Sequence, residues 1–126
     1  MISRIALLLA IVVSLGVPAS GQVPAATLID LRAKMKAGFG QKVRVEQRGR
    51  AVHITLATRT IDDATYLSTL RAACGHLGRR SSLASEIAIL NDAGAQGRVF
   101  ASPAQCEAVA NSKMTDAAIL AATHPF

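Results

Sequence analysis

Hydrophobic and polar positions along the chain change period several times, and each change marks a predicted element. After the short segment QVPAA, Leu28, Leu31 and Met35 recur at helical spacing. Basic residues occupy other positions of the same segment. Thr27, with Asp30 three residues later, predicts the start of this helix through a capping box. Gly38 and Gly40 predict its end.

The next segment, QKVRVEQRGRAVHITLATRT, alternates with a period of two on both sides of QRGR. This pattern predicts a β-hairpin. A turn centred on the Arg-Gly pair of QRGR would place Val45 opposite Val52 and Val43 opposite Ile54. Every inward side chain would then meet another inward side chain, so the turn and the alternation agree.

A second helix is predicted to open at Thr60, with an acidic residue three positions later at Asp63. Gly78 is expected to end it, and RRSS is expected to form a loop. Its predicted buried stripe consists of Leu67, Leu70, Cys74 and Leu77.

The following segment, LASEIAILNDAGAQGRVFASP, has two interpretations. Short apolar alternation favours two more strands, around Ile87–Ile89 and Val99–Phe100, on either side of a turn-like NDAGAQG. The alternative is a helix capped by Ser82 and ended at Gly94. We prefer the strands.

Two more helices complete the pattern. Ser102-Pro103 predicts a helix start, with Gln105 completing a capping box, and a last helix covers roughly residues 115–123. The predicted order is α-β-β-α-β-(β)-α-α. This order indicates an α+β fold with a small, largely antiparallel sheet, a central β-hairpin and helices packed on one face.

The first 21 residues differ from the rest. Arg4 precedes an apolar run over 5–17, and small residues follow as far as Gly21, so the pattern predicts a Sec-type signal peptide cut before Gln22. The run is too short to span the hydrocarbon core of a membrane. We therefore expect residues 22–126 to form a single exported domain, periplasmic or secreted, with no stable membrane insertion after cleavage.

Export changes how the two cysteines are interpreted. Cys74 shares the buried stripe of the second helix, and Cys106 shares an inward face with Val109. Two inward cysteines in an exported chain predict one disulfide, Cys74–Cys106. His76 lies about 200° around the helix from Cys74, so the two side chains diverge.

An alternative interpretation remains for the stretch CGH. If the helix broke at Gly75, the thiol of Cys74 would be exposed near His76. The chain would then be a thiol-dependent enzyme or a redox protein. A redox-active pair usually forms a Cys-x-x-Cys motif at a helix start, which this sequence lacks.

Charge adds a candidate binding surface. The chain has a net charge of +6, and removal of Arg4 with the leader would leave +5. Most of the candidate cations lie on the outer face of the hairpin, with Glu46 as the one acid among them and Arg59 as a further member. The residues predicted to contact an anionic partner are Lys42, Arg44, Arg48 and Arg50.

Other chemistries find little support. The three histidines lack the spacing of a zinc site, so no metal ligands are predicted. Serine nucleophile motifs, phosphate loops and dinucleotide fingerprints are missing, so we predict no catalytic residues and no cofactor. Aromatic residues make up 3% of the chain, which argues against nucleic-acid binding by base stacking.

Together these features favour a non-enzymatic exported domain. Its expected partner is another component of the cell envelope, either a protein or an anionic surface such as lipopolysaccharide or acidic lipid.

Overall fold

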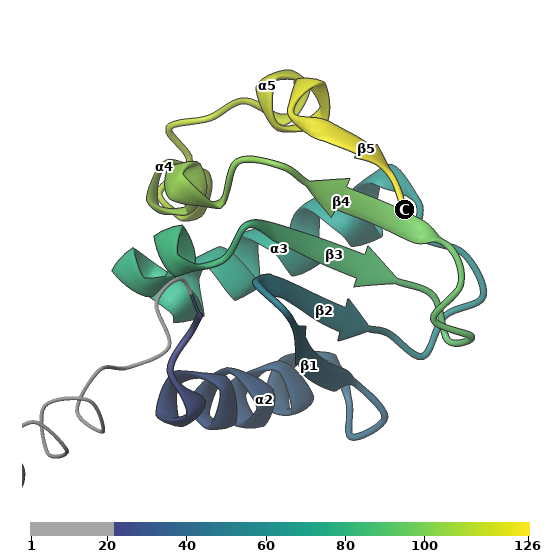
Figure 1. The fold of residues 1–126 in the computed structure, drawn as a ribbon. Helices are drawn as coiled ribbons and strands as arrows, with labels where there is room; N and C mark the ends of the chain where they lie inside the picture. The colour runs from purple at the N-terminus through teal and green to yellow at the C-terminus, as the bar shows by residue number, and fades with distance from the viewer. Residues whose placement is uncertain (1–21) are drawn as a thin grey trace, which may run out of the picture.

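The computed structural model describes residues 22–126, and the predicted leader, residues 1–21, lies outside them. A five-stranded mixed sheet forms the centre, with the helices on one side of it (Figure 1). The elements follow the order α-β-β-α-β-β-α-α-β. The predicted α+β class, with a largely antiparallel sheet and a β-hairpin, is confirmed.

The strands are β1 (Arg44–Arg48), β2 (Ala51–Thr55), β3 (Glu86–Leu90), β4 (Gly97–Phe100) and β5 (Thr123–Pro125). They lie in the sheet in the order in which they occur in the sequence. The β2–β3 pair is parallel, and the β1–β2, β3–β4 and β4–β5 pairs are antiparallel. Only the parallel pair needs a crossover, and the second helix supplies it.

The predicted hairpin forms, but its predicted register is wrong by two residues. Val45 lies opposite Ile54 instead of Val52, and the turn consists of Gly49 and Arg50. Gly49 has a φ of 60°, which suits the first position of a two-residue type II′ turn. Because side chains alternate with a period of two, a shift of two leaves the same residues facing the core.

The first helix, α2 (Ala25–Phe39), begins two residues before the predicted Thr27. Pro24 is its N-cap and no side chain caps the helix, so the predicted capping box is wrong. The carboxylate of Asp30 instead forms an ion pair with Lys34, 2.9 Å away and one turn later. The helix ends at Phe39, with Gly40 as its C-cap, so of the two glycines predicted to end it Gly38 still lies inside the helix.

The second helix, α3 (Asp63–Leu77), begins three residues after the predicted Thr60. Its N-cap is Asp62, whose carboxylate accepts a 2.7 Å hydrogen bond from the backbone N–H of Thr65. This hydrogen bond holds the pKa of Asp62 below its ordinary value of 3.8.

The ambiguous segment forms β3 and β4, so the preferred interpretation is confirmed and the helix capped by Ser82 is not present. Ser82 lies instead in a 3-10 helix, η1 (Gly78–Leu83), where its hydroxyl donates to the carbonyl of Arg79. β3 is buried on both faces of the sheet, which explains its nearly continuous apolar sequence.

The C-terminal helices are shorter than predicted. A 3-10 turn, η2 (Pro103–Gln105), precedes α4 (Cys106–Ala110), and Ser102 makes no side-chain cap. α5 (Asp116–Ala121) lies within the predicted helix. The fifth strand, β5, was not predicted and follows α5 almost directly.

A disulfide joins Cys74 of α3 to Cys106 of α4, as predicted. Both residues are fully buried, and their sequence separation is 32. Closing a loop of this length stabilises the folded state by about 3–4 kcal/mol in the chain-entropy model. The bond therefore fixes α4 against the main helix of the domain.

The core lies between the helices and one face of the sheet. Ile54 and Ile89, paired across β2 and β3, are fully buried there, as are Leu70 of α3 and Leu31 of α2. Tyr66 is the largest side chain in this core. The stability of the domain therefore comes mainly from the helix-covered face of the sheet.

The outer edge of β1 is partly closed by α2. The guanidinium of Arg32 donates two hydrogen bonds, of 2.9 and 3.2 Å, to the carbonyl of Val45. This contact occupies a backbone group that an edge strand would otherwise expose. It also fixes the position of the strand that carries Arg44 and Arg48, two of the four predicted contact residues.

Candidate functional site

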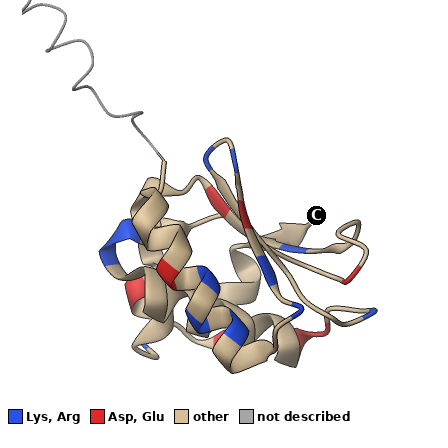
Figure 2. Cartoon of the chain, turned by 90° about the horizontal axis from the view of Figure 1, so that it is seen from below, with Lys and Arg blue, Asp and Glu red and all other residues tan. Residues whose placement is uncertain are grey.

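The opposite face of the sheet carries no helix (Figure 2). Residues paired across neighbouring strands share a face, so one row of side chains can be followed across the sheet. The row changes from charged on β1 to apolar on β3 and β4. It consists of Glu46, His53, Ala88, Val99 and His124.

The apolar part of this face forms a small cluster of its own. Ala88, Leu90 and Val99 are each at most 3% exposed and are separate from the main core. They give the helix-free face an apolar floor beside its charged edge. Ala88 and Val99 are too deeply buried to contact a ligand, and Leu90 is the member of the cluster that lines a hollow on this face.

A hollow of about 280 Å³ lies on this face. β1 and β2 form its polar wall, while Leu90, the β3–β4 loop at Ala93 and Gly94, and Phe126 form the rest. Its size is near the lower end of small-molecule sites, roughly 300–1,000 Å³. The polar wall consists of Arg44, Glu46, Arg48, His53 and Thr55.

The two arginines of the hollow differ in their partners. Arg48 forms an ion pair with Glu46, with 3.2 Å between nitrogen and oxygen. Arg44 lies directly across from Thr55. Within residues 22–126, neither the guanidinium of Arg44 nor the hydroxyl of Thr55 has a hydrogen-bond partner. The hollow therefore holds one unpaired cation beside one unused hydroxyl.

His53 is the β2 member of the row, beside Glu46, and packs against Phe126. Their rings are 5.5 Å apart and nearly perpendicular. Burial lowers the pKa of His53 below 6.5, the positive charge of Arg48 lowers it further, and Glu86 and Glu46 oppose the shift. The shift favours the neutral ring of His53, so the positive charge of the hollow comes from its arginines.

The structure brings together only part of the predicted cationic surface. Arg44 and Arg48 both line the hollow. Lys42 is exposed just before β1, at the Arg44 end. Arg50 occupies the turn at the opposite end of the hairpin. Arg59 lies in the loop after β2, beside the β3–β4 loop, so the cations are spread along the hairpin instead of gathered at one point.

Asn91 was not singled out in the sequence, yet it orders the rim of the hollow. It is 7% exposed, and its amide donates to the carbonyl of Arg59 at 3.2 Å. Its side-chain oxygen accepts from the backbone N–H groups of Ala95 and Gln96. One buried amide thus links the loop after β2 to the loop that walls the hollow. The turn-like NDAG was the only sequence signal for this role.

The cysteine and the histidine of CGH do not form a site. The sulfur of Cys74 is bonded to Cys106 and has no exposed surface. His76 is exposed on the opposite side of α3, and Gly75 does not break the helix. The predicted divergence of the two side chains is confirmed.

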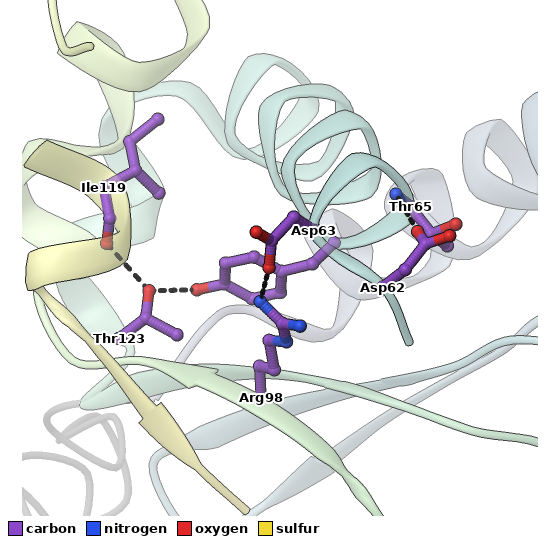
Figure 3. A network of polar contacts seen from close by, with 7 residues as sticks. Asp62, Asp63, Thr65, Arg98, Ile119 and Thr123 are labelled. Carbon is purple, nitrogen blue, oxygen red and sulfur yellow. Dashed lines mark hydrogen bonds and ion pairs between the residues drawn. The ribbon is translucent and has the colours of Figure 1, made fainter. Parts of the chain in front are cut away.

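A second polar cluster lies on the helix-covered side, where β4 meets α3 (Figure 3). Arg98 of β4 forms an ion pair with Asp63 at the start of α3. Its guanidinium also lies 5.8 Å from the centre of the Tyr66 ring. Both partners of Arg98 come from α3, so the contact fixes β4 against that helix.

The same cluster anchors the end of the chain. The hydroxyl of Thr123 donates to the carbonyl of Ile119 at 2.7 Å, so the Tyr66 hydroxyl donates to Thr123 at 2.6 Å (Figure 3). Burial raises the pKa of Tyr66. These groups have partners within the cluster, so we assign it a structural role: it positions β5, and with it Phe126 beside the hollow.

The part of the chain that the structure describes contains no group of three histidine, cysteine, aspartate or glutamate residues placed to hold a metal ion. Among the helices of the same residues, none has the length and apolar character needed to cross a membrane.

Comparisons with known proteins add no further information about the site. No protein-family model matches the chain, and no curated protein or solved structure matches it.

Proposed function

We propose that this protein is an exported, non-enzymatic domain that binds an anionic surface of the cell envelope, such as lipopolysaccharide or acidic phospholipid. The helix-free face of the sheet is the proposed contact surface. One observation carries the proposal: the unpartnered guanidinium of Arg44 lies in a hollow beside apolar side chains.

The balance of charge on this face favours an anionic partner. Lys42, just before β1, and Arg59, in the loop after β2, are exposed and, within the described residues, form no ion pair. Glu46, the one acid lining the hollow, is already paired with Arg48. Glu86 of β3 is a second acid on this face, near His53 but outside the lining of the hollow, and Lys42, Arg44 and Arg48 outnumber the two acids. The face therefore attracts anions, and the attraction should weaken as salt screens it.

The exposed aromatic ring on this face favours a lipid surface over a protein partner. Phe126 is 52% exposed and lines the same hollow as the arginines. Cations beside an exposed aromatic ring suit a membrane interface, where the ring enters the headgroup layer and the cations meet phosphates.

The disulfide supports the proposed location. Disulfides persist in oxidising compartments, and Cys74–Cys106 agrees with a periplasmic or secreted protein. Thiol chemistry at Cys74, the alternative function, would require reduction of this buried bond and exposure of the sulfur.

Co-sedimentation with vesicles tests the proposal. We expect the purified protein to bind vesicles that contain anionic lipid at low ionic strength, and to bind neutral phosphatidylcholine vesicles far more weakly. Near the surface each basic residue contributes about 1 kcal/mol, so the double variant Arg44→Glu/Arg48→Glu should bind at least about tenfold more weakly.

A matched control carries the same change of charge elsewhere. Arg79 and Arg80 lie in η1, which contributes nothing to the hollow, and Arg79 is 97% exposed. The variant Arg79→Glu/Arg80→Glu should retain most of the binding. Equal losses of binding in the two variants would mean that binding depends on net charge alone and not on the hollow. Vesicle binding that does not change with salt would contradict the proposal.

A further inference from the structure

We infer that the hollow on the helix-free face binds the terminal phosphate of one lipid headgroup, held by Arg44 and Thr55. This inference rests on the proposed function and gives that function a defined ligand. A protein face that binds membranes only through its net charge would not distinguish among anionic lipids. A site whose side chains hydrogen-bond to one phosphate would distinguish them.

The volume of the hollow limits what can enter it. A space of about 280 Å³ corresponds to the liquid volume of roughly nine water molecules. It can admit one small headgroup, but not a polymer chain. The β3–β4 loop and Phe126 form part of its wall. A phosphate at the end of a headgroup therefore fits more readily than a phosphate that carries substituents on both sides.

The unused polar groups of the hollow match phosphate oxygens. The planar guanidinium of Arg44 can donate two parallel hydrogen bonds to one phosphate. Thr55, directly across the strand pair, offers a hydroxyl donor. His53 lines the same space and offers one ring N–H in its neutral form.

The charge of a terminal phosphate also fits. A phosphate monoester carries about −1.5 to −2 near neutral pH, more than Arg44 alone would balance. Arg48 supplies the second cation, because its pair with Glu46 is solvent-exposed and such pairs are worth little. Arg48 can therefore turn toward a ligand while Glu46 turns toward water.

Vesicles of matched surface charge test the headgroup. Phosphatidic acid ends in a phosphate monoester, whereas phosphatidylglycerol carries a diester with a substituent on each side. We expect the native protein to prefer phosphatidic acid by about tenfold, the effect of one or two charged hydrogen bonds. In the variant Arg44→Lys/Thr55→Val, which keeps the net charge, the preference should disappear.

Soluble probes distinguish a lipid from a free source of phosphate. Glycerol 3-phosphate and inorganic phosphate are titrated separately into the native protein, while NMR follows the His53 ring and the Thr55 amide. We expect glycerol 3-phosphate to shift both signals and to compete with phosphatidic acid vesicles. Tighter binding of inorganic phosphate than of phosphatidic acid would identify free phosphate as the ligand and would overturn the lipid assignment.

The outcomes separate this inference from the proposed function. Equal binding to both anionic lipids, with salt sensitivity, would overturn the inference and leave the proposed function in place. Binding to neither lipid would contradict the proposed function. A preference that survives in Arg44→Lys/Thr55→Val would place the phosphate elsewhere, and the matched variant Arg79→Lys should keep the native preference.

Discussion

The two faces of the sheet are built from the same strands but differ in what covers them. On the covered face, Ile54 and Ile89 are fully buried beneath the helices. On the other face, the same two strands carry His53, Thr55 and Leu90 around an open hollow. Because the covered face supplies most of the buried apolar surface, the open face can carry charges and unused polar groups at little cost to folding.

Adjacent residues of β3 give the sharpest test of this difference. Ile89→Ala should lower the free energy of unfolding by about 4 kcal/mol, because the methyl groups lost leave a cavity under the helices. Leu90→Ala should cost less, about 2 kcal/mol, because Leu90 lines the hollow and the space that its side chain leaves joins the hollow instead of forming a sealed cavity. Urea denaturation of both variants measures the two values. Equal losses would mean that the two faces contribute alike.

Removal of the disulfide should lower the stability of the domain without changing the binding properties of the open face. The variant Cys74→Ala/Cys106→Ala should lose about 3–4 kcal/mol of stability, from the loop that the bond closes. Below its denaturation midpoint it should bind anionic vesicles like the native protein, because neither cysteine lies near the hollow. A binding loss in fully folded variant protein would show that the two faces are coupled.

The smallest expected effect concerns His53 on the open face. NMR titration should give a pKa below 6.5, and Arg48→Gln should raise it partway, because burial remains the larger cause. Since folding favours the neutral ring, this histidine's contribution to stability is present above pH 6.5 and declines as the pH falls through that value. A pKa unchanged by Arg48→Gln would mean that Arg48 does not lie near the ring in solution.

Alternation in the sequence was sufficient to predict four of the five strands but not their register. A shift of two residues keeps every side chain on its face, so the pattern could not distinguish a turn at Gly49-Arg50 from one a residue earlier. β5 escaped prediction because three residues that include a proline carry no periodic signal. It exists through pairing with β4, as in the hydrogen bond from the Phe126 N–H to the Gly97 carbonyl.

Only the part of the candidate site that lies on one strand could be predicted from the sequence. Arg44 and Arg48 lie on one strand, so their shared face follows from local alternation. Leu90, the β3–β4 loop and Phe126 reach the hollow from distant parts of the chain. Nothing near Arg44 in the sequence indicates that a C-terminal phenylalanine packs on His53.

The disulfide also decides what a single break in the backbone would do. Cys74 and Cys106 close a covalent ring that contains η1, β3, β4 and η2. The exposed Arg79 lies inside that ring. A peptide bond hydrolysed there would give a two-chain molecule heavier by one water, with no fragment released until the disulfide is reduced. The ring keeps β3 and β4 attached to both ends of the chain even after such a cut.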